Sequence, residues 1–383
     1  MAMHKANVVL GLLLTLLAAV AMADESARIV VVGDIHGDWD NFIQTLKDAG
    51  VVDEKERWQA GATQLVQIGD IADRGPDTRR IIEYFVKLEK QAKRKRGAVH
   101  VLIGNHEAMN IQGDLRYVHP GEYEAFVDRN SKKRQDAYYE QYIVYTKQTT
   151  PEAEWPTFDA ANRDSFNKEY PLGYVEHRRA WAPTGKIGKW VLKNPTVLLL
   201  EGNLFVHAGL APAYAKEPLS TLNTRVRTEL ADPNALTAES IVNAPDGPLW
   251  SRSAATGAEN ATNELEIDGV LATYDAKRMI IGHTPRVGTV LPRFNSKVIN
   301  VDVGMSKHYG GAVAALEIVG DQLTLIQNGQ RFAVPTDNDG VEGYLRAVSP
   351  LVAEPRRIER YIEQRRAAAE EIGQTAEADA AAN

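Results

Sequence analysis

The sequence predicts an α/β fold, in which strands and helices alternate along the chain. From residue 28 onward, short runs rich in β-branched residues alternate with longer helical stretches. Each early run also ends in glycine followed by polar residues. The expected strands are 28–32, 64–68 and 98–103, and the expected helices are 39–49 and 77–96. Ligand sites in α/β sheets lie at the carboxyl ends of strands, so these polar residues are the first candidates for a functional site.

The second half of the chain predicts further strands after an interruption. Residues 113–190 are polar and rich in tyrosine, and we expect them to form a mostly helical insert or cap. Strands resume at 196–200 and 204–206. A later β-rich set at 279–281, 288–291, 298–301, 312–318 and 322–326 predicts a second sheet packed on the first. Two mixed sheets flanked by helices would then form one catalytic domain, residues 27–330. Residues 340–383 are expected to form a C-terminal helix that frays into a flexible alanine-rich tail.

The first 23 residues are typical of a secretory signal peptide. Lys5 precedes an apolar run over 8–20, and Ala21-Met22-Ala23 has the small residues that a signal peptidase requires. The run is short for a hydrocarbon core about 30 Å thick, which disfavours an anchor that remains in the membrane. We therefore expect cleavage after Ala23, a periplasmic or secreted mature chain, and no stable membrane anchor.

Composition narrows the possible chemistry. The chain has 383 residues, 44% hydrophobic and 25% charged, as in ordinary globular proteins. It has no cysteine, which excludes disulfides, thiolate metal sites and a cysteine nucleophile. Residues 1–23 contain one of the 44 basic residues and no acidic one, so 43 basic and 51 acidic residues would remain, a net charge of about −8. Nucleic acid is therefore not an expected partner, and a phosphate site would need divalent cations to supply a local positive field.

Histidines and acidic residues gather at the ends of the expected strands. The motifs are Gly33-Asp34-Ile35-His36-Gly37, Gly69-Asp70-Ile71-Ala72-Asp73-Arg74-Gly75, Gly104-Asn105-His106-Glu107, His207-Ala208-Gly209 and Gly282-His283-Thr284. Each motif alone is more often an ordinary turn or helix cap, but five in one chain are not a chance pattern. Imidazole nitrogen and carboxylate oxygen suit divalent zinc, manganese, iron or nickel.

Taken together, the motifs resemble the phosphoprotein phosphatase branch of the calcineurin-like metallophosphoesterases, in order over about residues 29–318 without the insert. The resemblance implies a calcineurin-like fold with two divalent metal ions. It also implies that His106 is the general acid and that Asp73 orients it. The implied ligands of the first ion are Asp34, His36 and the bridging Asp70, and those of the second are Asp70, Asn105, His207 and His283.

Within this branch, the later part of the chain looks more like the bacterial and Shewanella-like phosphatases than the eukaryotic serine/threonine enzymes. The similarity is carried by Asp302-Val303-Gly304-Met305-Ser306 followed by Gly310-Gly311. Two departures from the family pattern are the alanine in His207-Ala208-Gly209, where His-Gly-Gly is commoner, and the long insert, which the compact enzymes lack. Neither departure changes a metal-ligand position, but both put the choice of substrate in doubt.

Physical chemistry supports the same roles. A phosphate monoester dianion repels hydroxide, and two cations about 3.5 Å apart would neutralise it and lower the pKa of a bridging water toward neutrality. His106 could protonate the leaving oxygen, with its tautomer set by Asp73. Arg74 is the expected phosphate clamp, because guanidinium binds phosphate oxygens bidentately.

Three further positions are less specific. The segment Trp250-Ser251-Arg252 resembles the region where the family keeps a second phosphate-binding arginine, so Arg252 is preferred over the alternatives Arg225 and Arg227. Glu107 is expected to hydrogen-bond to a histidine ligand. His308, close to Asp302 in sequence, is a candidate for a substrate contact.

These observations favour a metal-dependent phosphatase, a hydrolase that acts on phosphate monoesters of a phosphorylated protein or a small phosphoester. The alternative within enzymes is a phosphoanhydride hydrolase acting on a dinucleoside polyphosphate, which would need a pocket for adenine. A third reading is an inactive, metal-stabilised module whose insert binds a partner. That reading is disfavoured because every position the chemistry requires is filled: six ligands, a proton donor with its carboxylate, and an arginine.

Overall fold

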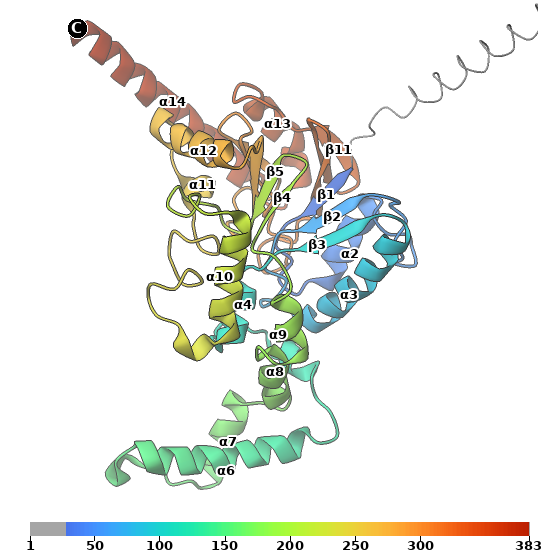
Figure 1. Ribbon diagram of the computed structural model, residues 1–383, viewed down its shortest axis with the longest axis vertical. Coiled ribbons are helices and arrows are strands. Elements are labelled where there is room, and N and C mark those ends of the chain that lie inside the picture. The colour runs from blue at the N-terminus through green and yellow to red at the C-terminus, as the bar shows by residue number, and fades with distance from the viewer. Residues whose placement is uncertain (1–27, 383) are drawn as a thin grey trace, which may run out of the picture.

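The computed structural model describes residues 28–382, and two β-sheets share its hydrophobic core (Figure 1). The first sheet has the strand order β11-β10-β9-β1-β2-β3, and the second has the order β4-β5-β6-β8-β7. Each sheet contains parallel and antiparallel pairs, which confirms the predicted mixed α/β architecture. The strands are β1 Ile29–Val32, β2 Gln64–Gln67, β3 Ala98–Val101, β4 Val197–Leu200, β5 Asn203–Val206, β6 Arg278–Ile281, β7 Leu291–Arg293, β8 Val298–Asn300, β9 Ala314–Val319, β10 Gln322–Gln327 and β11 Gln330–Ala333.

Parallel strands in each sheet precede the sequence motifs. In the first sheet β1 pairs with β2 and β2 with β3, so that Val32, Gln67 and Val101 lie side by side at the strand ends. In the second sheet β5, β6 and β8 are also parallel. Every residue of β1, β5 and β6 is buried, and apart from Asn203 and Arg278 at the starts of β5 and β6 these strands are apolar. The loops that follow the parallel strands therefore all leave a sheet on the same side, at the carboxyl ends of its strands.

Helices flank the sheets and connect the strands. Helix α2 begins after Asp38, whose side chain accepts the backbone N–H of Asn41, and it buries Phe42 and Leu46. The α-helices are α2 Trp39–Asp48, α3 Thr78–Arg94, α4 Asn105–Gln112, α5 Pro120–Glu124, α6 Ser131–Thr149, α7 Ala160–Glu169, α8 Tyr174–Trp181, α9 Lys186–Val191, α10 Leu219–Ala231, α11 Ser253–Thr256, α12 Ala261–Thr273, α13 Gly340–Val348 and α14 Pro355–Ala382. Short 3-10 helices span Glu152–Glu154, Pro233–Ala235 and Ser349–Leu351.

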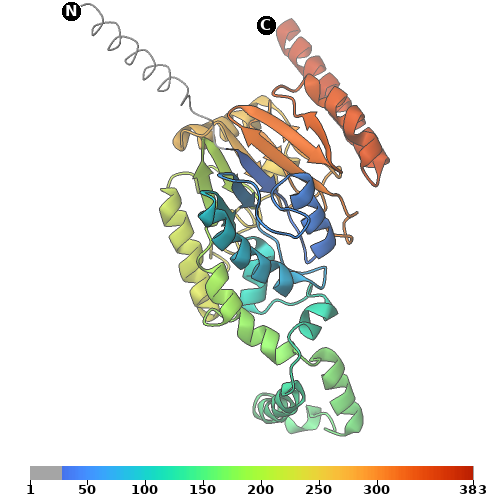
Figure 2. The same ribbon diagram turned by 90° about the vertical axis from the view of Figure 1, so that its right-hand side faces the viewer.

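Helices α5 to α9 make up most of residues 113–190, as the polar, tyrosine-rich composition predicted. Figures 1 and 2 both show α6 and α7 at the far end of the molecule from the sheets, with α8 and α9 between. An aromatic cluster joins α6, α7 and α8: its rings lie 4.7 to 5.9 Å from their neighbours and belong to Tyr138, Tyr139, Tyr142, Phe166, Tyr170 and Tyr174. These tyrosines therefore pack the helices of the insert against one another.

Several elements differ from the sequence prediction. Strands β9 and β10 were expected in the second sheet, but β9 pairs with β1 and β10 pairs with β9, so both belong to the first sheet. Strand β7 begins at Leu291 rather than at residue 288, and it contains Pro292. Strand β11 was not predicted at all. The C-terminal region forms two helices, α13 and α14, and the helical backbone continues to Ala382 where an alanine-rich tail was expected.

The predicted signal peptide, residues 1–23, lies outside the described residues. Between residues 28 and 382, no helix has both the length and the apolar character needed to cross a membrane.

Candidate metal centre

Two groups of potential metal ligands meet at one aspartate, Asp70. Ligand atoms of His36, Asp70 and His106 all lie within 4.8 Å of one another, and so do those of Asp70, His207 and His283. The Oδ2 atom of Asp70 is 3.7 Å from Nε2 of His36 and 3.3 Å from Nε2 of His207. The five side chains are buried. A carboxylate shared by two histidine groups is the arrangement that a bridging ligand of two cations requires.

Asn105 belongs to the second group. Its Oδ1 lies 2.9 Å from Nε2 of His207 and 2.8 Å from Nδ1 of His283. Helix α4 begins at Asn105, so the side chain is placed at the end of β3 by the first turn of that helix. In the described part of the chain, Nε2 of His283 is buried and has no hydrogen-bond partner. A buried ring nitrogen without a partner is consistent with a metal ligand, because buried polar atoms otherwise find partners.

Asp34 and His283 connect the two sheets at this site. Asp34 follows β1, and its carboxylate accepts the backbone N–H of His283, which follows β6, at 2.9 Å. The approach is close: a Cβ added to Gly282 would lie 2.3 Å from Oδ1 of Asp34, and one added to Gly104 would lie 2.2 Å from Oδ1 of Asp70. The glycines in front of His283 and Asn105 are therefore required by the packing of the aspartates against the next loop.

The acidic groups of the site need positive charge. Burial raises the pKa of Asp34 well above its ordinary value, and the neighbouring Asp302 and Asp70 raise it further. Burial likewise raises the pKa of Asp302 to about 7. Burying several carboxylates together is costly unless they are neutralised or bind cations. Donors of this type and number fit divalent metal ions, so the residues present are suited to the group that the sequence implied.

Two of the proposed histidine ligands, His36 and His283, are held in the neutral form that binds metals. Burial lowers the pKa of His36 to about 3 and that of His283 to about 2, so both rings are neutral near pH 7. Nδ1 of His36 donates to the carbonyl of Ala72 at 2.9 Å, and Nδ1 of His207 donates to the carbonyl of Ile68 at 3.0 Å. These bonds direct the Nε2 atom of each ring toward Asp70.

Glu107 corrects one expectation from the sequence. Its carboxylate contacts no histidine ligand; it accepts four backbone N–H groups, from Gly104, Asp70, Ile71 and Ala72, at 2.9 to 3.1 Å. The reason is geometric: Glu107 is the third residue of α4, where a carboxylate reaches back to the start of its own helix. Glu107 thus joins the loops that carry Asp70 and Asn105.

His106 and Asp73 form a close pair beside the ligands. Nδ1 of His106 lies 2.5 Å from Oδ2 of Asp73, and the other oxygen of Asp73 accepts from Nδ2 of Asn110 at 2.9 Å. Burial alone would lower the pKa of His106, but the carboxylates of Asp70 and Asp73 outweigh it and raise that pKa. The sequence indicated the His106–Asp73 pair but missed Asn110, which lies one helical turn after His106 in α4.

The two predicted phosphate clamps lie in different surroundings. The guanidinium carbon of Arg74 is 3.9 Å from the ring centre of Tyr117 and 5.8 Å from that of Tyr309. Arg252 is exposed, and its Nη1 donates to Oγ1 of Thr284, the residue after His283, at 2.9 Å. Both arginines are therefore next to the candidate centre.

The other predicted positions are less closely placed. On α10, Arg225 pairs with Glu217, and Arg227 donates to the carbonyl of Leu192, so both alternatives to Arg252 are engaged elsewhere. His308 is exposed, and its ring contacts that of Tyr309 edge-on with the centres 4.7 Å apart. The ring of Tyr309 in turn lies 5.2 Å from that of His36. The sequence did not single out Tyr309, although it is next to His308.

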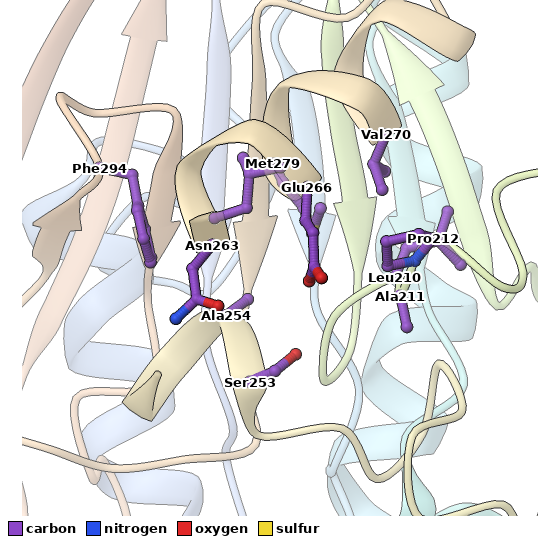
Figure 3. A pocket seen from close by; sticks show the side chains of 11 residues that line it. Leu210, Ala211, Pro212, Ser253, Ala254, Asn263, Glu266, Val270, Met279 and Phe294 are labelled. Atoms are coloured by element: carbon purple, nitrogen blue, oxygen red, sulfur yellow. The ribbon is translucent and has the colours of Figure 1, made fainter. Parts of the chain in front are cut away.

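A small cavity lies behind the loop that follows His207. Figure 3 shows Asn263 and Glu266 of α12 between Phe294 on one side and Leu210, Ala211 and Pro212 on the other. Its volume is about 40 Å³, far below the roughly 300 Å³ at which pockets for small molecules begin. None of the predicted site residues lines it. The cavity is therefore not the substrate site.

Comparison with known proteins agrees with this geometry. The model of the calcineurin-like phosphoesterase family matches residues 27–287, and the chain belongs to that family. It is a hydrolase of the phosphatase type.

The relatives define the branch more closely. Shewanella-like protein phosphatase 2 of Arabidopsis thaliana is 30% identical over 298 residues, which cover 74% of this chain and 73% of the plant protein. An uncharacterised protein of Schizosaccharomyces pombe is 31% identical over 299 residues, 76% of each chain. A solved structure of a cold-active protein-tyrosine phosphatase from a psychrophilic Shewanella species superposes with a TM-score of 0.60, at 25% identity and over 80% of both chains. The predicted resemblance to Shewanella-like phosphatases is confirmed.

Proposed function

We propose that this chain is a metal-dependent phosphatase that hydrolyses phosphate monoesters, with a phosphorylated protein or a small phosphoester as substrate. The observation that carries the proposal is Asp70, which two groups of buried ligands share next to the His106–Asp73 pair. The products would be inorganic phosphate and the free alcohol or phenol.

The proposed ligands of one ion are Asp34, His36 and Asp70, and those of the other are Asp70, Asn105, His207 and His283. When bound, two divalent cations would neutralise the phosphate dianion and make a water acidic enough to attack near pH 7. Manganese, iron, zinc and nickel all suit these donors, and metal analysis of the purified chain identifies the ions present.

The chain's own residues would complete the reaction. Arg74 and Arg252 bind the phosphate oxygens and hold the ester bond in position. As that bond breaks, His106 donates its proton to the departing oxygen, and Asp73 stabilises the protonated ring before the transfer. His106 also lies within ligand distance of Asp70, and the variants described below distinguish an acid from a ligand.

The relatives support a phosphorylated protein as the substrate. The Arabidopsis relative is named a protein phosphatase, and the Shewanella structure is described as that of a protein-tyrosine phosphatase. A panel of phosphotyrosine, phosphoserine and phosphothreonine peptides, with a dinucleoside polyphosphate, tests this choice. Faster turnover of the dinucleotide than of every peptide would favour the anhydride hydrolase instead.

The first test is hydrolysis of p-nitrophenyl phosphate by the purified chain, stripped of metal and then supplied with manganese, together with His106→Asn. We expect activity that depends on metal and falls by about a hundredfold or more in the variant, while the variant binds as much metal as the wild type. A variant that loses metal would make His106 a ligand. A folded, metal-loaded wild type without activity on any substrate of the panel would refute the proposed function.

We also propose that the mature chain is periplasmic or secreted. The support is the apolar run over 8–20 and the small residues before Asp24. Amino-terminal sequencing of the chain from separated cell fractions tests this, with a start at Asp24 in an exported fraction as the expected result. A chain that keeps residues 1–23 in the cytoplasm would contradict it.

A further inference from the structure

The base of the insert contacts two residues, Asp73 and Arg74, in the loop between β2 and α3. Asp73 and Arg74 both have positive φ angles, 72° and 68°, in a region that residues other than glycine rarely adopt. Such backbone persists where surrounding contacts hold it. Two of these contacts come from the insert: from Tyr117, just before α5, and from Glu122, within α5.

Tyr117 contacts both the backbone and the guanidinium group of Arg74. The backbone N–H of Arg74 donates to the carbonyl of Tyr117 at 3.0 Å. The guanidinium group lies over the Tyr117 ring, with its carbon 3.9 Å from the ring centre, and this ring is also 5.2 Å from that of His106. An arginine over an aromatic face is stabilised by cation–π attraction and keeps its N–H groups available at its edge. Arg74 is therefore oriented before a phosphate arrives.

Glu122 holds Asp73. Its Oε1 accepts the backbone N–H of Asp73 at 2.9 Å, and the side chain is only 1% exposed. The carboxylate of Asp73 in turn bonds to His106 and Asn110, so Asp73 is held both by its backbone and by its side chain. The insert also contacts Asn110, which bonds to Asp73: Arg178 of α8 donates to the carbonyl of Asn110.

We propose that the base of the insert is part of the catalytic apparatus: Tyr117 is a positioning residue for the phosphate clamp Arg74, and Glu122 is a positioning residue for Asp73. The inference rests on the proposed function, since it assigns effects to phosphate binding and proton donation. The two contacts should affect different kinetic steps. Loss of the Tyr117 contact should weaken phosphate binding, and loss of the Glu122 contact should slow the bond-breaking step.

The first test compares Tyr117→Leu and Tyr117→Phe in the full, metal-loaded chain. Tyr117→Leu removes the aromatic face, so KM for p-nitrophenyl phosphate and the inhibition constant of inorganic phosphate should rise about three- to thirtyfold, with kcat within about twofold of the wild type. Tyr117→Phe keeps the aromatic face and should therefore reverse most of the rise in KM that Tyr117→Leu causes. Tyr145→Leu is the matched control, because Tyr145 lies on α6 with 67% of its surface exposed.

The second test uses Glu122→Gln, which keeps an acceptor for Asp73, and Glu122→Ala, which removes it. We expect Glu122→Ala to lower kcat about tenfold with little change in KM, and Glu122→Gln to recover most of the loss. The loss should be larger for phenyl phosphate than for p-nitrophenyl phosphate, because phenol is the poorer leaving group. Glu122→Asp withdraws the oxygen by one methylene and replaces Glu122→Ala if that variant does not fold. Glu124→Ala, at an exposed position of α5, is the control.

The outcomes separate the inference from the function on which it rests. A rise in KM for Tyr117→Leu together with a fall in kcat for Glu122→Ala supports the inference. An active wild type with both variants unchanged, or with KM and kcat altered alike in both, would overturn the inference and leave the phosphatase function intact. A folded wild type that hydrolyses no phosphate monoester with manganese, iron, zinc or nickel would overturn both.

Discussion

Replacing Asp73 by asparagine should slow catalysis by an amount that the structure allows us to estimate. The carboxylate of Asp73 lies 2.5 Å from Nδ1 of His106, and both side chains are buried. A hydrogen bond to a charged group contributes about 1.5–3 kcal/mol. Because 1.36 kcal/mol corresponds to a factor of ten in rate, kcat should fall roughly 10- to 150-fold if the bond acts fully in the transition state. Asparagine keeps the shape and an oxygen for Asn110, so the fold should be preserved.

The assay compares two leaving groups. p-Nitrophenolate departs with little need for a proton, whereas the phenol of tyrosine has a pKa of about 10 and needs one. The loss in kcat should therefore be several times larger for phosphotyrosine than for p-nitrophenyl phosphate. His106→Asn removes the acid itself, and combining it with Asp73→Asn should add little, because the two residues act as one unit.

Two results would refute this reasoning. Equal losses on both substrates would show that Asp73 does not act through proton donation. Losses of His106→Asn and Asp73→Asn that multiply in the double variant would show that the residues act independently, despite the 2.5 Å contact.

Three further predictions follow from other contacts. Asp70→Asn should lower the bound metal from two ions to fewer than one per chain by elemental analysis, and full retention would exclude a bridging role. Glu107→Ala leaves four buried N–H groups without an acceptor and should cost about 4 kcal/mol or more in urea unfolding; a cost below about 1 kcal/mol would contradict this. Burial lowers the pKa of His177 to about 3 in the folded chain. As the pH falls below about 6.5, the unfolded chain therefore binds a proton that the folded chain does not, and the free energy of unfolding decreases. The wild type should lose about 2 kcal/mol of unfolding free energy between about pH 7.5 and pH 5 that His177→Phe does not lose, and equal losses in the two proteins would refute this prediction.

The positions of most strands could be predicted because the central strands are buried and mostly apolar, but the sequence did not show that β9 and β10 pair within the first sheet. Strand β11 was missed because its sequence, Gln330 to Ala333, is mostly exposed at the edge of the first sheet and lacks such a run. Strand β7 was placed too early because Pro292 argues against a strand. Proline is tolerated there because β7 pairs only with β8 and is the edge of the second sheet.

The site could be predicted as far as its residues follow strand ends. Asp34, Asp70, Asn105, His207 and His283 all do, so the order of strands was enough to bring them together. Contacts made by the insert had no such signal: Glu122 lies 49 positions after Asp73 in the chain and follows no strand. Asn110 was accessible in principle, because residues four apart on a helix share a face.

The division of the proposed ligands between the two sheets has a consequence for assembly of the protein. Asp34, His36, Asp70 and Asn105 follow strands of the first sheet, and His207 and His283 follow strands of the second, so the second proposed ion takes its ligands from both sheets. High-affinity uptake of that ion would then have to wait until both sheets have folded and docked. Since an ion that binds only the docked state at a hundred times its Kd contributes about 2.7 kcal/mol, chelation should loosen the junction between the sheets before either sheet unfolds. The supply of metal would thus set the stability of the folded protein as well as its activity.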